Sequence, residues 1–100
     1  MRKKLVRNKI PSIIKASGRK PIYRKANRDE VPALLYDKVI EELNEFVENP
    51  SAEEAGDIYE VLCALCHFHK ISMSKVHEAS DAKRLNRGNF NKNIVLEKVL

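Results

Sequence analysis

The chain of 100 residues lacks the features of an exported or membrane-bound protein. It has two cysteines, Cys63 and Cys66, which lie too close in sequence for a useful framework disulfide. No apolar run is long enough to span a membrane. The basic residues at the N-terminus are not followed by the apolar segment of a signal peptide. We therefore expect a cytoplasmic protein that does not interact with membranes.

Acidic residues are absent from positions 1–28, which hold eleven basic residues. The pattern reverses in residues 29–60, where eleven of the fourteen acidic residues lie with a single basic residue, Lys38. Residues 61–100 are again basic. A formal net charge of +5 suggests nucleic acid or another polyanion as a partner, but here the charge is segregated along the chain. A metal site beside phosphate-binding cations would account for this distribution.

The length allows a single domain with a small core, so we expect a dimer or a larger homo-oligomer. Within this domain, residues 1–28 are predicted to form a basic N-terminal arm, with a short helical turn over residues 12–17 and an extended segment over residues 21–24. Residues 29–70 are predicted to form a helical hairpin. Residues 71–100 are predicted to form a third helix and a C-terminal tail.

The first long helix is predicted to begin at Asp29 as N-cap, to carry Pro32 in its first turn, and to end near Glu48. Its apolar positions follow the helical period: Leu35, Val39, Leu43, Phe46 and Val47.

The break at residues 49–51 leads into a second helix. Ser51 and Glu54 have the spacing of a capping box that opens this helix, which we expect to end near Lys70. So short a break favours an antiparallel hairpin. The predicted buried positions of the second helix are Ala55, Ile58, Leu62, Leu65 and Phe68.

The third helix is predicted to start at Ser72 or Ser74, to extend to about Leu85 and to be terminated by Gly88. Residues 93–100 fit either a strand or a packing tail. The expected fold is mainly α, with short extended segments near the termini and a bundle completed by oligomerisation.

Two carboxylate pairs stand at i, i+3 spacing, Glu42 with Glu45 and Glu54 with Asp57, so each pair shares one helix face. In a hairpin the two pairs lie level, and four converging carboxylates would be costly without a cation among them. Hard divalent cations, Mg²⁺ above all, prefer such oxygen ligands. Gly56 would allow a neighbouring backbone or a ligand to approach closely. The alternative is a solvated charged face, with Glu54 serving only the capping box.

The motif E-E-x-x-E at residues 41–45, followed by E-x-x-D at residues 54–57, resembles the paired motif of the all-α nucleoside triphosphate pyrophosphohydrolases. This is the MazG-like superfamily, which also includes the phosphoribosyl-ATP pyrophosphohydrolases. Residues 5–11 (LVRNKIP) resemble the opening segment of the small single-domain members, and residues 83–90 (KRLNRGNF) resemble their basic C-terminal signature. The chain departs from the family pattern at Asn8, Ser12 and Asn89, which bears on the substrate contacts.

This resemblance implies an Mg²⁺-dependent enzyme that cleaves the α–β phosphoanhydride of a nucleoside triphosphate or related nucleotide, with Mn²⁺ as a substitute metal. The products are a nucleoside monophosphate and pyrophosphate, and the family suggests house-cleaning of noncanonical nucleotides. A metal-bound water is the expected nucleophile. The expected metal ligands are Glu42, Glu45, Glu54 and Asp57, with Glu41 as a further ligand or a helper that orients the water. The candidate phosphate contacts, for which the alternative is ordinary surface cations, are Arg7, Lys9, Lys83, Arg84 and Arg87.

Cys63, Cys66 and His67 match the c-type haem attachment pattern, and His69 lies nearby. We interpret this match as a coincidence, because covalent haem attachment belongs to exported proteins. A zinc site is disfavoured, since four residues on one continuous helix cannot all face a tetrahedral ion.

A competing hypothesis is a non-enzymatic, nucleic-acid-binding or regulatory helical protein that uses its basic arm on phosphates. Tyr23 is the only aromatic residue of that arm, and no helix-turn-helix or zinc pattern is evident. A third hypothesis is an inactive member of the superfamily that has kept only a role in helical assembly.

Overall fold

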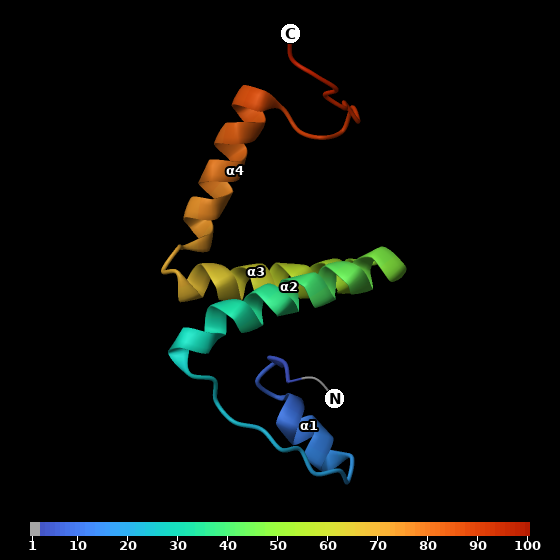
Figure 1. The fold of residues 1–100 in the computed structure, drawn as a ribbon, viewed down its shortest axis with the longest axis vertical. Helices are drawn as coiled ribbons and strands as arrows, with labels where there is room; N and C mark the ends of the chain where they lie inside the picture. Colours follow the sequence, from blue (N-terminus) through green and yellow to red (C-terminus); the bar gives the residue numbers. More distant parts are fainter. Residues whose placement is uncertain (1–2) are drawn as a thin grey trace. The chain divides into compact units, whose positions relative to one another are not determined.

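The computed structural model describes residues 3–100, which contain four α-helices, one short 3-10 helix and no strand (Figure 1). The prediction of a mainly α protein is therefore confirmed. The elements are α1 (Ile10–Ala16), η1 (Arg28–Glu30), α2 (Val31–Glu48), α3 (Ala52–Phe68) and α4 (Met73–Arg87). The chain forms two compact units, one ending at Leu65 and the other extending from Cys66 to Leu100. Among the described residues, no helix combines the length and the apolar character needed to cross a membrane.

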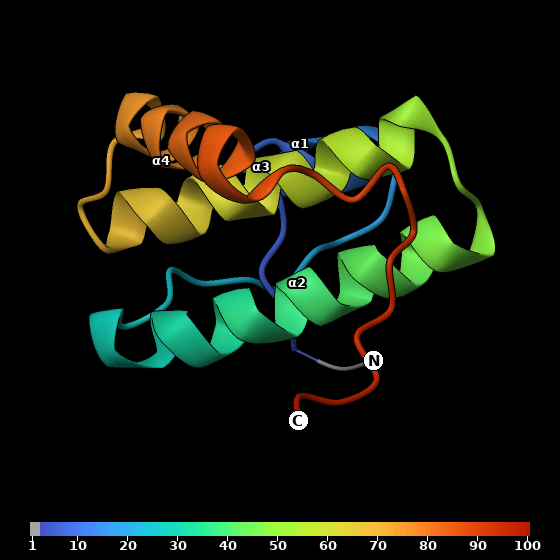
Figure 2. The ribbon, with the colours of Figure 1, turned by 90° about the horizontal axis from the view of Figure 1, so that it is seen from above.

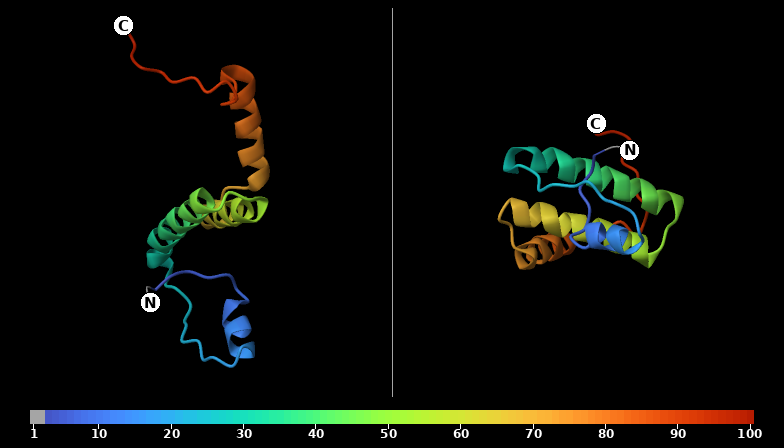
Figure 3. Two further views of the ribbon diagram at one scale, coloured as in Figure 1. Left: turned by 90° about the vertical axis from the view of Figure 1, so that its right-hand side faces the viewer. Right: turned by 90° about the horizontal axis from the view of Figure 1, so that it is seen from below.

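Helix α1 begins at Ile10, two residues before the predicted turn, with Pro11 in its first turn. At its end the Ser17 hydroxyl donates to the carbonyl oxygen of Ile14 at 2.6 Å. Gly18 then adopts a φ of 89°, a conformation that favours glycine and stops the helix. The residues between Gly18 and η1 form neither helix nor strand, as Figure 3 shows for the segment that leads towards α2.

The start of α2 differs from the prediction that Asp29 is its N-cap. Asp29 lies inside η1, and Glu30 takes the N-cap position without a side-chain capping bond. The Glu30 carboxylate instead accepts hydrogen bonds from both terminal nitrogens of Arg24, at 2.9 and 3.3 Å. This contact lowers the pKa of Glu30. The ion pair ties the extended part of the arm to η1, and Pro32 lies in the first turn of α2 as predicted.

Helix α3 starts where the capping pattern places it. The hydroxyl oxygen of Ser51 accepts a hydrogen bond from the backbone nitrogen of Glu54 at 3.1 Å, which satisfies one of the free donors of the first turn. The helix ends at Phe68, two residues before the predicted Lys70. Lys70 itself has a φ of 60°, and the next amide, of Ile71, donates back to the carbonyl of Cys66 at 2.8 Å, as in a helix-ending turn.

Helix α2 lies beside the first part of α3 in Figure 2. The buried face of α2 is rotated from the predicted one, because Leu43 and Val47 are exposed, at 43% and 76%. Leu35 is buried, and Glu42, seven positions further on and therefore on the same face, is buried with it. The buried face of α2 thus carries the Glu42 carboxylate, where the apolar pattern predicted Leu43 and Val47.

The buried face of α3 differs in the same way. Val61 is buried, whereas the predicted Ala55 and Leu62 are exposed. Ile58 and Leu65 are half-buried, in agreement with their predicted direction. The two acidic residues of the motif share the α3 face with these apolar side chains, so less of the face is available to a hydrophobic core.

In the second unit, Ser72 rather than Ser74 caps α4, and its hydroxyl oxygen accepts a hydrogen bond from the amide of Lys75 at 3.3 Å. The helix ends at Arg87, two residues beyond the predicted Leu85, and Gly88 follows with a φ of 82°. Residues 93–100 form no strand, and their side chains are exposed. Neither alternative predicted for this tail, a strand or a packing tail, is therefore seen within the described residues.

Candidate metal centre

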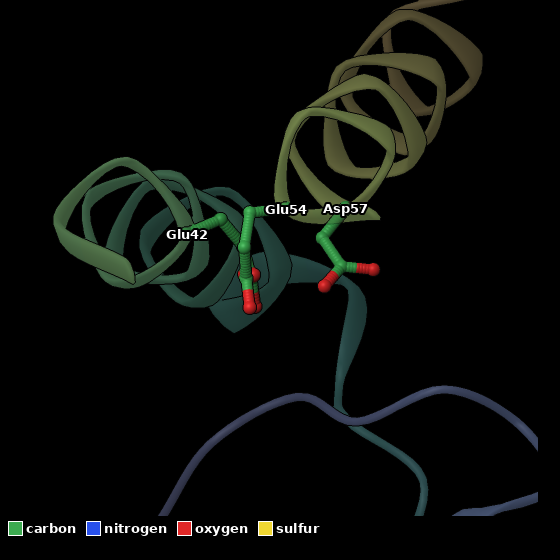
Figure 4. Close-up of side chains that lie close together, drawn as sticks. All are labelled: Glu42, Glu54 and Asp57. Carbon is green, nitrogen blue, oxygen red and sulfur yellow. The ribbon is translucent and has the colours of Figure 1, made fainter. Parts of the chain in front are cut away.

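Three carboxylates from two helices meet in the first unit. Glu42 extends from α2, and Glu54 and Asp57 extend from the start of α3 (Figure 4). One ligand oxygen of each residue lies within 4.8 Å of those of the other two. Glu42 is 9% exposed, and the other two side chains are half-buried. Three of the four predicted metal ligands thus converge.

Glu45, the fourth predicted ligand, is exposed on α2 and lies outside this trio. A step of three residues turns a helical side chain by about 60° from its starting direction. With Glu42 directed at α3, Glu45 therefore points to one side of the cluster. It remains close enough that its charge acts on Glu54.

Burial and the negative charges of Glu45, Asp57 and Glu42 raise the pKa of Glu54 above its usual value. No ion pair involving Glu54 is formed within residues 3–100. Both its burial and its neighbours oppose its ionisation. A cation bound at this position would remove that cost.

Lys38 is a functional candidate that the motif did not reveal. Its ammonium lies 2.5 Å from Oε2 of Glu41 and 3.4 Å from Oε1 of Glu42. Burial lowers the pKa of Lys38, but its contacts with these two carboxylates outweigh that effect and leave the pKa raised. The signal was present in the sequence, because Lys38 precedes the acids by three and four positions, the spacing of helical ion pairs.

Glu41 forms ion pairs with two lysines. Besides its contact with Lys38, its Oε1 lies 3.4 Å from the ammonium of Lys4. These cations hold the pKa of Glu41 below its usual value despite partial burial, with the hydrogen bond from Lys38 as the main cause. Glu41 is therefore directed at lysines rather than at the trio, and the helper role predicted for it remains a prediction.

The candidate phosphate contacts fall in both units. Arg7 donates from Nη2 to Oδ1 of Asp57 at 2.7 Å, and Lys9 is exposed. The other three candidates belong to α4, where Arg84 pairs with Asp81 at 3.0 Å. A concave surface of about 430 Å³ in the second unit is lined by Ala79, Ser80, Lys83, Arg84, Gly88, Asn89 and Phe90.

Gly56 and the two cysteines are further features of the sequence whose surroundings the structure describes. A Cβ atom placed on Gly56 would meet no heavy atom within 4 Å among the described residues, so the close backbone approach expected there does not occur within this chain. Cys63 is half-buried and Cys66 buried, both as free thiols. In the part of the chain that the structure describes, the carboxylate trio is the only group with metal-ligand spacing.

The residues of the trio fit a hard divalent cation. All three donors are carboxylate oxygens, and they come from neighbouring helices rather than from one exposed turn. Mg²⁺ is usually bound by one or two carboxylates together with substrate phosphates, and Mn²⁺ accepts the same ligands. The donor set disfavours zinc, which prefers sulfur and imidazole nitrogen in structural sites.

Comparisons of this chain with known protein families, with curated proteins and with solved structures found no match. The resemblance to the MazG-like superfamily therefore rests on the sequence motifs themselves.

Proposed function

We propose that this chain is an Mg²⁺-dependent nucleoside triphosphate pyrophosphohydrolase of the MazG-like superfamily. It would cleave the α–β phosphoanhydride and release a nucleoside monophosphate and pyrophosphate. The observation that carries this proposal is the convergence of Glu42, Glu54 and Asp57 within 4.8 Å. A merely solvated charge run has no reason to bring carboxylates from two helices together, because their mutual repulsion opposes it.

Each group of residues has a distinct role in this proposal. Glu42, Glu54 and Asp57 hold the metal, and Glu45 contributes from the edge of the cluster. When bound, Mg²⁺ neutralises the triphosphate and lowers the pKa of the attacking water, so no protein nucleophile is required. Lys38 holds Glu41 and orients Glu42. The proposed phosphate contacts are Arg7, Lys9, Lys83, Arg84 and Arg87.

The proposed substrate is a nucleoside triphosphate or a related nucleotide, and clearance of noncanonical nucleotides in the cytoplasm is the role that the resemblance favours. The N-terminal arm supports an enzyme over a free nucleic-acid-binding segment. Lys4 and Arg24 of the arm are paired with Glu41 and Glu30 of the same chain. An arm committed to binding nucleic acid would gain more from leaving these cations free.

We further propose that α2 and α3 form an antiparallel hairpin that a second copy completes to a bundle. Tyr36, Ile40, Leu43 and Val47 are all exposed, at 41% or more, and their spacing places them along one face of α2. An exposed apolar face of this length on a chain with so few buried side chains favours self-association.

The decisive experiment is pyrophosphate release from a panel of standard and modified nucleoside triphosphates, with and without Mg²⁺. The natural chain is compared with Glu42→Gln and Asp57→Asn, and Glu53→Gln is the control because Glu53 is exposed and lies outside the trio. We expect metal-dependent release that both trio variants abolish and the control retains. Folded protein with no release from any nucleotide would contradict the proposal. Salt-sensitive binding of nucleic acid that ignores Mg²⁺ would then favour the non-enzymatic alternative.

A further inference from the structure

Arg7 joins the N-terminal arm to the candidate metal centre. Its guanidinium nitrogen Nη2 lies 2.7 Å from Oδ1 of Asp57, although the two residues are 50 positions apart. Arg7 lies just before α1, in a segment without helix or strand. A positive charge from the arm is therefore already placed on one of the three carboxylates.

Among residues 3–100, no other cation forms an ion pair with the two α3 carboxylates of the trio. Lys38 contacts Glu41 and Glu42, and Lys4 contacts Glu41, all on α2. Within residues 3–100, Arg7 forms the only ion pair of Asp57. A divalent cation entering the trio would meet the Arg7 charge, whether it used the oxygen that Arg7 occupies or the other oxygen of Asp57.

The Arg7 pair is suited to exchange. The side chains of Arg7 and Asp57 are 56% and 36% exposed, and solvated ion pairs of this kind are weak. A triphosphate offers guanidinium several charged oxygens and the bidentate geometry that arginine prefers. Once metal and triphosphate are present together, Asp57 has a better cation and Arg7 has a better anion.

We propose that Arg7 couples metal binding to nucleotide binding. In the free protein it holds Asp57 and weakens the affinity for a bare divalent ion, and on nucleotide binding it leaves Asp57 for a phosphate oxygen. The inference rests on the proposed function. It predicts opposite changes in two affinities, because loss of the Arg7 charge strengthens binding of the metal alone and weakens binding of the phosphate ligand.

The test measures both affinities on the full chain. Mn²⁺ alone is titrated and its free concentration is followed by electron paramagnetic resonance. Methylenebisphosphonate, a non-hydrolysable pyrophosphate analogue, is titrated by calorimetry at saturating Mg²⁺. We expect Arg7→Ala to bind Mn²⁺ about two- to fivefold more tightly and to bind the phosphonate more weakly. The change in Mn²⁺ affinity is this small because an exposed ion pair is weak.

Arg19→Ala is the matched control, since Arg19 is an exposed arginine of the same arm without an ion pair in the described chain. It should leave the Mn²⁺ affinity unchanged. Arg7→Gln is a second variant, and circular dichroism shows that each protein is folded. Equal Mn²⁺ affinities of the natural chain and both Arg7 variants would overturn the inference, as would unchanged phosphonate affinity. The natural chain and Asp57→Asn are also compared. If no Mn²⁺ binding is lost on this substitution, the metal site itself is overturned, and with it the proposed function.

Discussion

The ammonium of Lys38 lies 3.4 Å from Oε1 of Glu42, the most buried carboxylate of the cluster, and these side chains are 18% and 11% exposed. Replacing Lys38 by methionine would leave Glu42 and Glu41 without this cation. We expect Lys38→Met to lower the free energy of unfolding by about 1–2 kcal/mol, because a partly buried charge loses its partner. Lys38→Arg should retain most of the stability.

Urea denaturation measures this difference. Lys75→Met is the control, since it breaks the pair of Lys75 with Glu78, whose side chains are 76% and 68% exposed. The control should change stability by less than about 0.5 kcal/mol. Equal effects of the two methionine substitutions would show that Lys38 does not stabilise the cluster.

The raised pKa of Glu54 predicts a particular dependence of stability on pH. The folded state holds this proton more tightly than the unfolded chain. Stability therefore falls as the pH rises from the usual carboxyl range through the raised pKa, and stays lower above it. Glu54→Gln should remove this decrease and be more stable than the natural chain at neutral pH without metal.

Added Mg²⁺ should reverse that order, since it stabilises the ionised cluster of the natural chain and has less effect on Glu54→Gln. Thermal unfolding at several pH values, with chelator or with Mg²⁺, gives both results. Glu60→Gln should follow the natural chain throughout, since Glu60 is exposed on the same helix and is not one of the charges that raise the Glu54 pKa. A Glu54→Gln protein that is less stable than the natural chain in chelator at neutral pH would refute the prediction.

Two glycines should respond to alanine with opposite signs. A Cβ on Gly56 or on Gly88 would meet no heavy atom of the described residues within 4 Å. The backbone conformation alone therefore determines how each substitution changes stability. Gly56 lies within α3, where alanine should stabilise by about 0.5–1 kcal/mol. Gly88 has a φ of 82°, where alanine should destabilise the end of α4 by about 1 kcal/mol.

Denaturant unfolding and helix content by circular dichroism measure both effects. If Gly56→Ala instead weakened self-association or metal-dependent activity, a ligand or a second copy would lie against Gly56. That result would restore the close approach expected from the sequence, with a partner outside this chain.

The exposed apolar face of α2 predicts the surface of self-association. Leu43→Lys together with Val47→Lys should convert the assembly to a smaller species, because charge on this face prevents its burial. Analytical ultracentrifugation measures the mass. Leu85→Lys is the control, as Leu85 is 87% exposed on α4. An unchanged mass for the double variant would place the contact elsewhere.

The sequence predicted the ends of the helices to within two residues, because the groups that start and stop a helix act locally. Ser51, Ser72 and Gly88 act on backbone groups within one turn of themselves, so their effect can be inferred from neighbouring residues. Asp29 was misplaced because the N-cap preference for aspartate did not account for the 3-10 turn that precedes α2.

The direction of each helix face was less predictable. The period of apolar residues identified α2 as a helix but assigned Leu43 and Val47 to its buried side, where the structure has Glu42. Two apolar faces compete on this helix, and a periodic pattern alone does not say which of them meets α3. The convergence of three carboxylates was predictable from spacing and a short link, whereas the divergence of Glu45 was not.

The sequence by itself determined where the helices begin and end, where the acidic residues are concentrated, and that a basic arm precedes them, because these properties depend on residues close together in the chain. Only the tertiary structure decided that Glu42 is buried, that Lys4 reaches Glu41, and that Arg7 reaches Asp57. The physical reason is that the ionisation of a carboxylate depends on every charge within a few ångströms, and residues 37 or 50 positions apart reach that distance only through the fold.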